Sequence, residues 1–234
     1  MLEAIAAGTD DPATLASLAR GSLQKKRPAL ERALTGLIGP HQRVLLQSLL
    51  RQVEFFDAEI AELNQEVAKR LHGIEEALDR LDTIPGVGRR CAEEILAEIG
   101  ADMNRFPSAA HIASWAKVCP GNNESAGKRM SGRTGSGDPW LRQALVEAAW
   151  GASHARKTYL AAQYHRLAAR RGGKRAALAL AHSILVIAYY VLKRGVAYED
   201  LGPNYFDERN RSAVIRRSVR RIEQLGFKVT LDAA

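Results

Sequence analysis

Cysteine is scarce in this chain, with Cys91 and Cys119 the two among 234 residues. Neither forms a CxxC pair or has a histidine at the spacing of a metal site, which argues against a disulfide framework and a structural zinc. The first residues also lack the basic start and apolar core of a signal peptide. We therefore expect a cytoplasmic protein in which this chain itself holds no metal or other cofactor.

Strand-like alternation of apolar and polar residues is almost absent, apart from the final segment Phe227–Leu231. This pattern predicts an all-α fold with at most a short C-terminal strand. One long apolar run, Ala176–Leu192, is about as short as a bilayer span can be, and His182 near its middle would cost free energy in lipid. We expect this run to be a helix buried all round in the core, and no contact with a membrane.

Charge is unevenly distributed along the chain. Residues 1–80 hold 10 Lys and Arg against 12 Asp and Glu, whereas residues 81–234 hold 24 against 14, so the net charge of +8 belongs to the second part. A basic region of this kind favours a polyanionic partner.

The first predicted domain, residues 1–77, is a helical linker with a coiled coil over about 41–71. Its apolar positions are spaced alternately by three and four residues: Leu46, Leu49, Val53, Phe56, Ile60, Leu63 and Val67. An a/d seam of this regularity favours pairing with a second chain into a homo-oligomer. The alternative is one long helix packed on its own short neighbours.

The second predicted domain covers residues 78–234. It divides into a helix-hairpin-helix motif over about 78–99, a serine loop over 118–138 and a helical bundle over 139–226. Within the bundle, Asp138-Pro139 is a typical helix start, with an acid as N-cap and proline in the first turn.

The helix-hairpin-helix motif is a candidate DNA grip. Its residues are Pro85, Gly86, Val87, Gly88, Arg89 and Arg90. Two glycines let a backbone approach a phosphate closely, the following helix offers free N–H groups, and the arginines add charge. Such a contact holds the DNA backbone without reading sequence. The alternative is an ordinary turn between helices.

The serine loop is long and rich in glycine, which is typical of a functional loop in a compact domain. Ser125 lies in it close to three cations, Lys128, Arg129 and Arg133. Taken alone, a loop serine more often caps a helix or closes a turn than acts as a nucleophile. We expect Trp115, Trp140 and Trp150 to pack in the core. Trp115 and Trp140 flank the loop, so they should also fix its ends.

Several short motifs occur in a fixed order over about residues 80–195. They are the Pro85–Gly88 turn, Phe106-Pro107, Ala113–Ala116, Cys119–Gly121, Ser125–Lys128, Gly132-Arg133 and Trp140–Arg142. As an ordered set they resemble the C-terminal domain of the IS-one-ten family of insertion-sequence transposases, the bridge-RNA-guided recombinases. The resemblance implies that Ser125 attacks a DNA phosphodiester and holds the strand end as a phosphoserine.

The same resemblance implies partners for this domain. They are double-stranded DNA of the element ends and target, a guide RNA, and a RuvC-like N-terminal domain whose four acidic residues bind divalent metal. Residues 1–80 show no strand-rich segment of that kind, so we expect the RuvC-like domain to be missing from this chain. A non-catalytic DNA- or RNA-binding dimerisation module is the alternative function.

Basic residues extend the expected contacts with nucleic acid. Lys128 and Arg129 are candidates for stabilising charge at the scissile phosphate, and Arg133 and Arg142 for holding DNA. The last predicted helix carries four more arginines on the face opposite its apolar residues: Arg216, Arg217, Arg220 and Arg221. Charge alone does not separate DNA from guide RNA as their partner.

Overall fold

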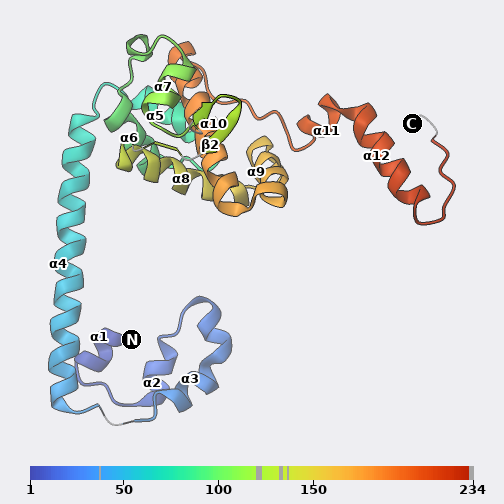
Figure 1. The fold of residues 1–234 in the computed structure, drawn as a ribbon. Helices are drawn as coiled ribbons and strands as arrows, with labels where there is room; N and C mark the ends of the chain where they lie inside the picture. Colours follow the sequence, from blue (N-terminus) through green and yellow to red (C-terminus); the bar gives the residue numbers. More distant parts are fainter. Residues whose placement is uncertain (37, 120–122, 132–133, 136, 232–234) are drawn as a thin grey trace. The chain divides into compact units, whose positions relative to one another are not determined.

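The computed structural model describes residues 1–36, 38–119, 123–131, 134–135 and 137–231. The chain divides into two compact units, Met1–His72 and Gly73–Ala234. The sequence predicts a boundary a few residues farther along, between residues 77 and 78. The described residues form an all-α fold with one long helix, as predicted (Figure 1).

The first unit contains three short α-helices, one 3-10 helix and the long helix α4. In order they are α1 (Leu2–Ala6), α2 (Pro12–Ser17), the 3-10 helix η1 (Gly21–Lys26), α3 (Arg27–Ala33) and α4 (Pro40–Arg70). Arg43 of α4 ties α1 down, because its guanidinium donates to the Ile5 carbonyl and pairs with Asp10. The Gln47 amide adds a bond of 2.9 Å to the Ala6 carbonyl.

Helix α4 runs for 31 residues without a single buried residue. Pro40 stands at its first position, where a missing N–H costs nothing, and no glycine or proline follows until Gly73. Five successive seam residues expose 54–62% of their surface: Leu49, Val53, Phe56, Ile60 and Leu63. The apolar seam is therefore open to solvent in the single chain.

The second unit is a helical body with a short hairpin. Its elements are α5 (Glu75–Asp82), α6 (Arg89–Ile99), η2 (Met103–Arg105), α7 (Ala109–Trp115), β1 (Asn123–Ser125), β2 (Lys128–Ser131), α8 (Pro139–His154), α9 (Tyr159–Arg171), α10 (Gly173–Arg194), α11 (Tyr205–Arg209) and α12 (Arg211–Glu223). Helix α11 is joined to α9 by an ion pair of 2.9 Å between Asp207 and Arg166.

Helix α10 is the centre of this body and packs against α5, α7, α8 and α9. Its buried face carries Leu180, Ile184, Leu185 and Tyr189. By length and composition alone α10 could cross a membrane, with a mean hydropathy of 1.7, yet half of that stretch is buried inside the protein. The expectation of a core helix holds, but burial all round was wrong, because His182 and Val186 line a surface hollow.

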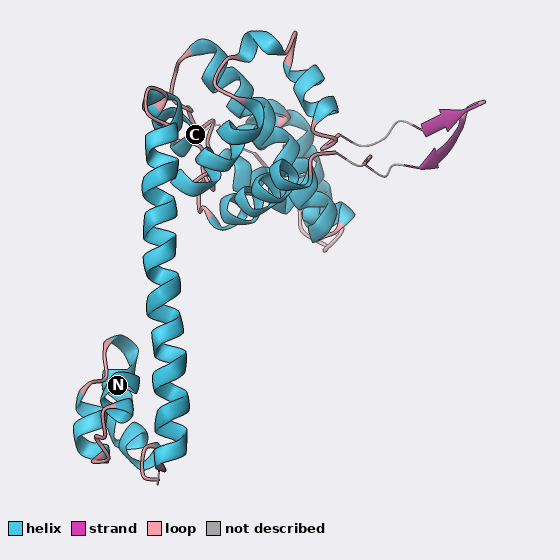
Figure 2. Cartoon of the chain, turned by 90° about the vertical axis from the view of Figure 1, so that its left-hand side faces the viewer, coloured by secondary structure: helices cyan, strands magenta, loops and turns pink. Residues whose placement is uncertain are grey.

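The strand predicted at the C-terminal end is absent, and strands occur elsewhere in the described residues. Among the described residues, β1 and β2 form a two-stranded antiparallel sheet within the predicted serine loop, drawn in magenta in Figure 2. Residues Phe227–Leu231 form no strand. A lone alternating segment has no partner for its backbone hydrogen bonds, whereas a hairpin supplies both strands within a few residues.

Two further expectations need correction. The last predicted helix is split at Asn210 into α11 and α12, and none of its residues is buried. The tryptophans are not core residues, since Trp115, Trp140 and Trp150 expose 45%, 70% and 42% of their surface. Alanines and leucines of α8 and α10 fill most of the interior instead, together with the ring of Tyr189.

Candidate functional site

A tight turn links α5 to α6. The Val87 N–H donates to the Ile84 carbonyl over 2.9 Å, with Pro85 and Gly86 between them. Gly86 has φ +88°, which together with proline before it defines a type II turn. Ile84 and Val87 are buried in the core, so the turn is anchored from both sides.

The two glycines of the turn have different surroundings. A Cβ atom on Gly86 would lie 2.2 Å from the carbonyl oxygen of Ala148 and 2.4 Å from the N atom of Ala152, both on α8. A Cβ atom on Gly88 would meet nothing within 4 Å. The missing side chain of Gly86 therefore serves the packing of the turn on α8. Gly88 alone leaves open space of the kind that a phosphate could enter.

Gly88 is also the N-cap of α6, and no side chain caps this helix. The first N–H groups of a helix have no partner within the helix and carry its positive end. The start of α6 thus presents its first backbone N–H groups next to an open glycine. This is an arrangement that suits a phosphate oxygen.

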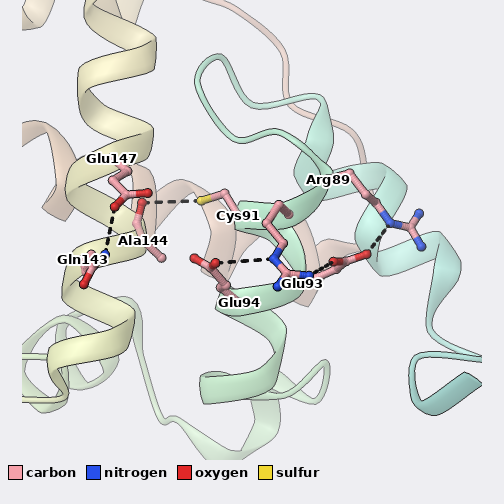
Figure 3. A network of polar contacts seen from close by, with 8 residues as sticks. Arg89, Cys91, Glu93, Glu94, Gln143, Ala144 and Glu147 are labelled. Atoms are coloured by element: carbon pink, nitrogen blue, oxygen red, sulfur yellow. Dashed lines mark hydrogen bonds and ion pairs between the residues drawn. The ribbon is translucent and has the colours of Figure 1, made fainter. Parts of the chain in front are cut away.

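The arginines beside these donors are already paired with acids. Arg89 Nε lies 3.1 Å from Glu93 Oε1 (Figure 3), and Arg89 Nη1 lies 3.5 Å from Asp79 Oδ1. Arg90 Nη1 lies 3.7 Å from a Glu93 carboxylate oxygen, and Arg90 Nε lies 3.8 Å from one of Glu94. Three carboxylates therefore surround two guanidinium groups, and the local field is much less positive than the sequence pair Arg89-Arg90 suggests.

Cys91 fixes α6 against α8. Its Sγ lies 3.5 Å from the Ala144 carbonyl oxygen, as Figure 3 shows. Burial, reinforced by the charges of Glu94 and Glu147, raises the pKa of the Cys91 thiol to about 12. The group is a packing residue rather than a nucleophile at neutral pH.

Ser125 lies at the tip of the β1–β2 hairpin and is exposed. The strands are joined by Ala126 and Gly127, whose φ angles of +50° and +72° are those of a two-residue turn of type I′. An alanine in this left-handed region is strained, and such strain is often found at functional sites. The tight turn holds the serine hydroxyl clear of the helical core.

Lys128 is the direct partner of Ser125 across the ladder. Side chains of opposed residues in an antiparallel pair stand on the same face, about 5 Å apart at Cβ. Arg129 is one step farther along and pairs with Glu124 instead. The structure thus brings Lys128, and not Arg129, opposite the candidate nucleophile. Arg133 lies outside the described residues.

The chain that follows the hairpin is tied to the helices. The Arg142 guanidinium donates to the Thr134 hydroxyl over 2.7 Å, so this predicted DNA contact is occupied in holding the loop. A Cβ atom on Gly137 would lie 2.6 Å from the Ala116 carbonyl oxygen, which shows how closely the loop passes α7.

Asp138 caps α8 as predicted, accepting from the N–H groups of Trp140 and Leu141 over 2.8 and 3.0 Å. The bond to the Leu141 N–H, together with one to Glu98, lowers the pKa of Asp138. The same bond to Asp138 raises the pKa of Glu98 on α6. The carboxyl groups of Glu98 on α6 and Asp138 at the start of α8 therefore lie close together.

Comparison with known proteins places this geometry in context. Residues 78–166 match the transposase family IS116/IS110/IS902. One relative is the protein described as "Insertion element IS110 uncharacterized 43.6 kDa protein" of Streptomyces coelicolor, 33% identical over 129 residues. The aligned stretch covers 53% of this chain and 30% of the relative. The transposase resemblance of the sequence is confirmed at this level.

The segment that matches the IS116/IS110/IS902 transposases contains the Pro85–Gly88 turn, Ser125 and Lys128. The arginines of α12 lie beyond it. Arg216, Arg217, Arg220 and Arg221 are all exposed, and no ion pair of theirs occurs among the described residues. Among all the residues that the structure describes, no three His, Cys, Asp or Glu side chains lie close enough together to hold a metal ion.

Sequence reasoning missed two features of this transposase-family segment. The Glu98–Asp138 pair joins residues far apart in sequence, and no periodicity signals it. The corner between α8 and α9 carries Arg156 and Lys157, which lie outside both helices because α8 ends at His154 and α9 begins at Tyr159. The two adjacent cations at the helix boundary are the sequence feature from which this corner could have been predicted.

Proposed function

We propose that this chain is the DNA-handling part of a transposase, in which Ser125 is the nucleophile for strand cleavage and transfer. The observation that carries the proposal is the position of Ser125. It stands exposed at a strained hairpin tip, opposite Lys128, inside the segment that matches the transposase family. Since the chain covers 30% of its relative, the activity of a whole transposase is part of the proposal.

The proposed step is an in-line displacement at phosphorus. A bond forms between Ser125 Oγ and the phosphorus atom as the bond from phosphorus to the leaving sugar oxygen breaks. The serine proton passes to a base, and the leaving oxygen takes up a proton. Lys128 supports the step by offsetting negative charge on the phosphate oxygens in the transition state. A divalent metal in the RuvC-like domain would add charge stabilisation from outside this chain.

The grip on DNA is assigned to the α5–α6 turn. Gly88 and the uncapped N–H groups of α6 contact one phosphate, while Gly86 holds the turn against α8. Arg89 and Arg90 contribute less than their charge suggests, because a phosphate must compete with Asp79, Glu93 and Glu94 for them. Such a contact is independent of DNA sequence.

Assembly is assigned to α4, and a further contact with nucleic acid is assigned to α12. The open seam of α4 pairs with that of a second chain, which would cover side chains that water now surrounds. The exposed arginines of α12 bind the phosphates of DNA or of a guide RNA.

The test is a search for a covalent protein–DNA adduct. The chain is incubated with element-end DNA, guide RNA and a RuvC-like domain supplied in trans, and denatured products are separated and sequenced by mass spectrometry. An adduct at Ser125 supports the transposase. DNA binding that persists with no adduct under any of these conditions would favour the non-catalytic binding module.

A further inference from the structure

The corner between α8 and α9 forms a basic hollow of about 410 Å³. Its charged and titratable lining consists of His154, Arg156, Lys157 and His165, and all four side chains are exposed. No acidic residue lines it. We propose that this hollow, here named the α8–α9 corner, holds the phosphate backbone of duplex DNA. The inference rests on the proposed DNA-binding function and adds a second contact to the α5–α6 turn.

The cations of the α8–α9 corner differ from those of the α5–α6 turn in whether acids pair with them. Arg89 is bridged to Asp79 and Glu93, whereas no carboxylate pairs with Arg156 or Lys157 in the described part of the chain. A cation without an acid partner gives its full charge to an incoming phosphate and releases counterions when it binds. The corner is therefore the stronger electrostatic anchor of the two.

An acid at the start of α9 is already bound to other groups. Asp200 accepts from the Tyr159 N–H over 3.0 Å, from the Tyr198 hydroxyl over 3.0 Å and from the Gly202 N–H over 2.7 Å. Its carboxylate thus caps the start of α9 and closes the neighbouring loop. It does not neutralise Arg156 or Lys157 by direct contact.

The corner is continuous with the turn through α8. Gly86 lies against the backbone of Ala148 and Ala152, and the next two residues of α8, Ser153 and His154, line the hollow. His154 Nδ1 lies 2.8 Å from the Trp150 carbonyl oxygen, which leaves Nε2 for another partner. A duplex whose backbone reaches the turn at Gly88 therefore has a second set of donors at the C-terminal end of α8.

The start of α9 forms part of the wall of the hollow. Thr158 caps α9 through its hydroxyl, and the first turn of α9, at Ala161 and Ala162, forms one wall. Lys157 stands between the two helices with φ +63°, a conformation that lysine rarely adopts. Because glycine adopts this conformation readily, Lys157→Gly should remove the charge without harming the fold.

The test compares duplex binding by variants of the full chain with equal changes in charge. Arg156→Gln with Lys157→Gln removes the corner cations, and Arg170→Gln with Arg171→Gln removes two exposed cations from the other end of α9. Affinity for a labelled duplex of arbitrary sequence is measured by fluorescence anisotropy over a range of salt concentrations. The corner variant should lose at least about tenfold in affinity, and its plot of log K against log salt should flatten by about 2.

A second variant distinguishes loss of charge from loss of folding. Lys157→Gly removes one charge at a position where glycine is conformationally favoured, so the melting temperature should not fall while duplex affinity does. Equal losses in the corner variant and in the Arg170/Arg171 variant would show a general charge effect and overturn the assignment. So would a corner variant that loses affinity for an RNA hairpin or inorganic phosphate but not for the duplex.

The two proposals fail in different ways. A wild-type chain that binds no duplex at low salt contradicts the DNA-binding function and the corner with it. A wild-type chain that binds duplex, with a corner variant that binds equally tightly and a Gly88→Val variant that binds weakly, removes the corner alone.

Discussion

A side chain on Gly86 would collide with the carbonyl oxygen of Ala148, 2.2 Å from the Cβ position. This contact explains why glycine is needed at the turn even though the residue is exposed to solvent on its other side. Gly88, two residues on, has no such neighbour. The two glycines of one motif therefore carry different functions, one in folding and one in the proposed phosphate contact.

The first prediction separates these functions. Gly86→Ala should destabilise the chain by about 3 kcal/mol or more, because the new methyl group meets α8 backbone and the residue has a positive φ. Gly88→Ala should cost less than about 1 kcal/mol. Urea unfolding followed by circular dichroism measures both. Equal stability of the two variants would contradict the packing assigned to Gly86.

The sequence predicts the elements of this fold better than it predicts their contacts. The sequence identifies α4 from its heptad spacing, α8 from its Asp138-Pro139 start and α10 from its long apolar run. The pattern of residues 85–90 likewise identifies the turn. It does not show that Arg89 and Arg90 are paired with acids from the same helix and from α5, or that Gly86 faces α8.

The serine loop shows a second limit of sequence reasoning. Glycine-rich composition indicates a functional loop, but the hairpin within it depends on the backbone of Ala126 and Gly127, both at positive φ. Gly127 is typical of such a turn, whereas alanine in this conformation has no sequence signal. The register that sets Lys128 opposite Ser125 follows only from the paired strands.

The second prediction concerns assembly through α4. Phe56→Asp with Ile60→Asp should convert a dimer to a monomer, because charges would be buried in the paired seam. Ala58→Asp, at an outer position of the same heptads, should leave the dimer intact. Light scattering coupled to size-exclusion chromatography gives the mass. A wild-type chain that is already monomeric at high concentration would refute the coiled coil.

The third prediction concerns the two thiols. Burial raises the pKa of Cys91 to about 12 and also raises the pKa of Cys119. At mildly alkaline pH both groups are protonated, so Ellman's reagent should react with them far more slowly in the folded chain than in urea. Rapid reaction of Cys91 without denaturant would mean that α6 and α8 do not pack as described.

The fourth prediction concerns the N-cap of α8. The folded pKa of Asp138 is lowered, so its contribution to stability is present above the pKa of an unfolded aspartate, about 3.9, and is lost as the pH falls through the folded pKa. Asp138→Ala should lower the melting temperature near neutral pH, and the difference from wild type should shrink in acid. Asp138→Asn, which keeps a capping oxygen, should lose less. A difference that is independent of pH would contradict the cap.

The fifth prediction concerns the cations of the hairpin. Lys128→Ala should slow adduct formation more than Arg129→Ala does, because Lys128 is the ladder partner of Ser125 and Arg129 is not. Neither change should move the attachment site. Single-turnover kinetics in the reconstituted complex compare the two rates. A larger loss for Arg129→Ala would reject Lys128 as the main charge-stabilising group.

The most direct test of the account is the identity of the residue bound to DNA in the reconstituted complex. Ser125→Ala should fold and bind duplex like the wild type, since an exposed hydroxyl contributes little to either, yet form no covalent adduct. Ser131→Ala and Ser136→Ala, in the same loop, should still form it. An adduct mapped by mass spectrometry to any residue other than Ser125, or full strand transfer by the Ser125→Ala chain, would contradict the proposed nucleophile.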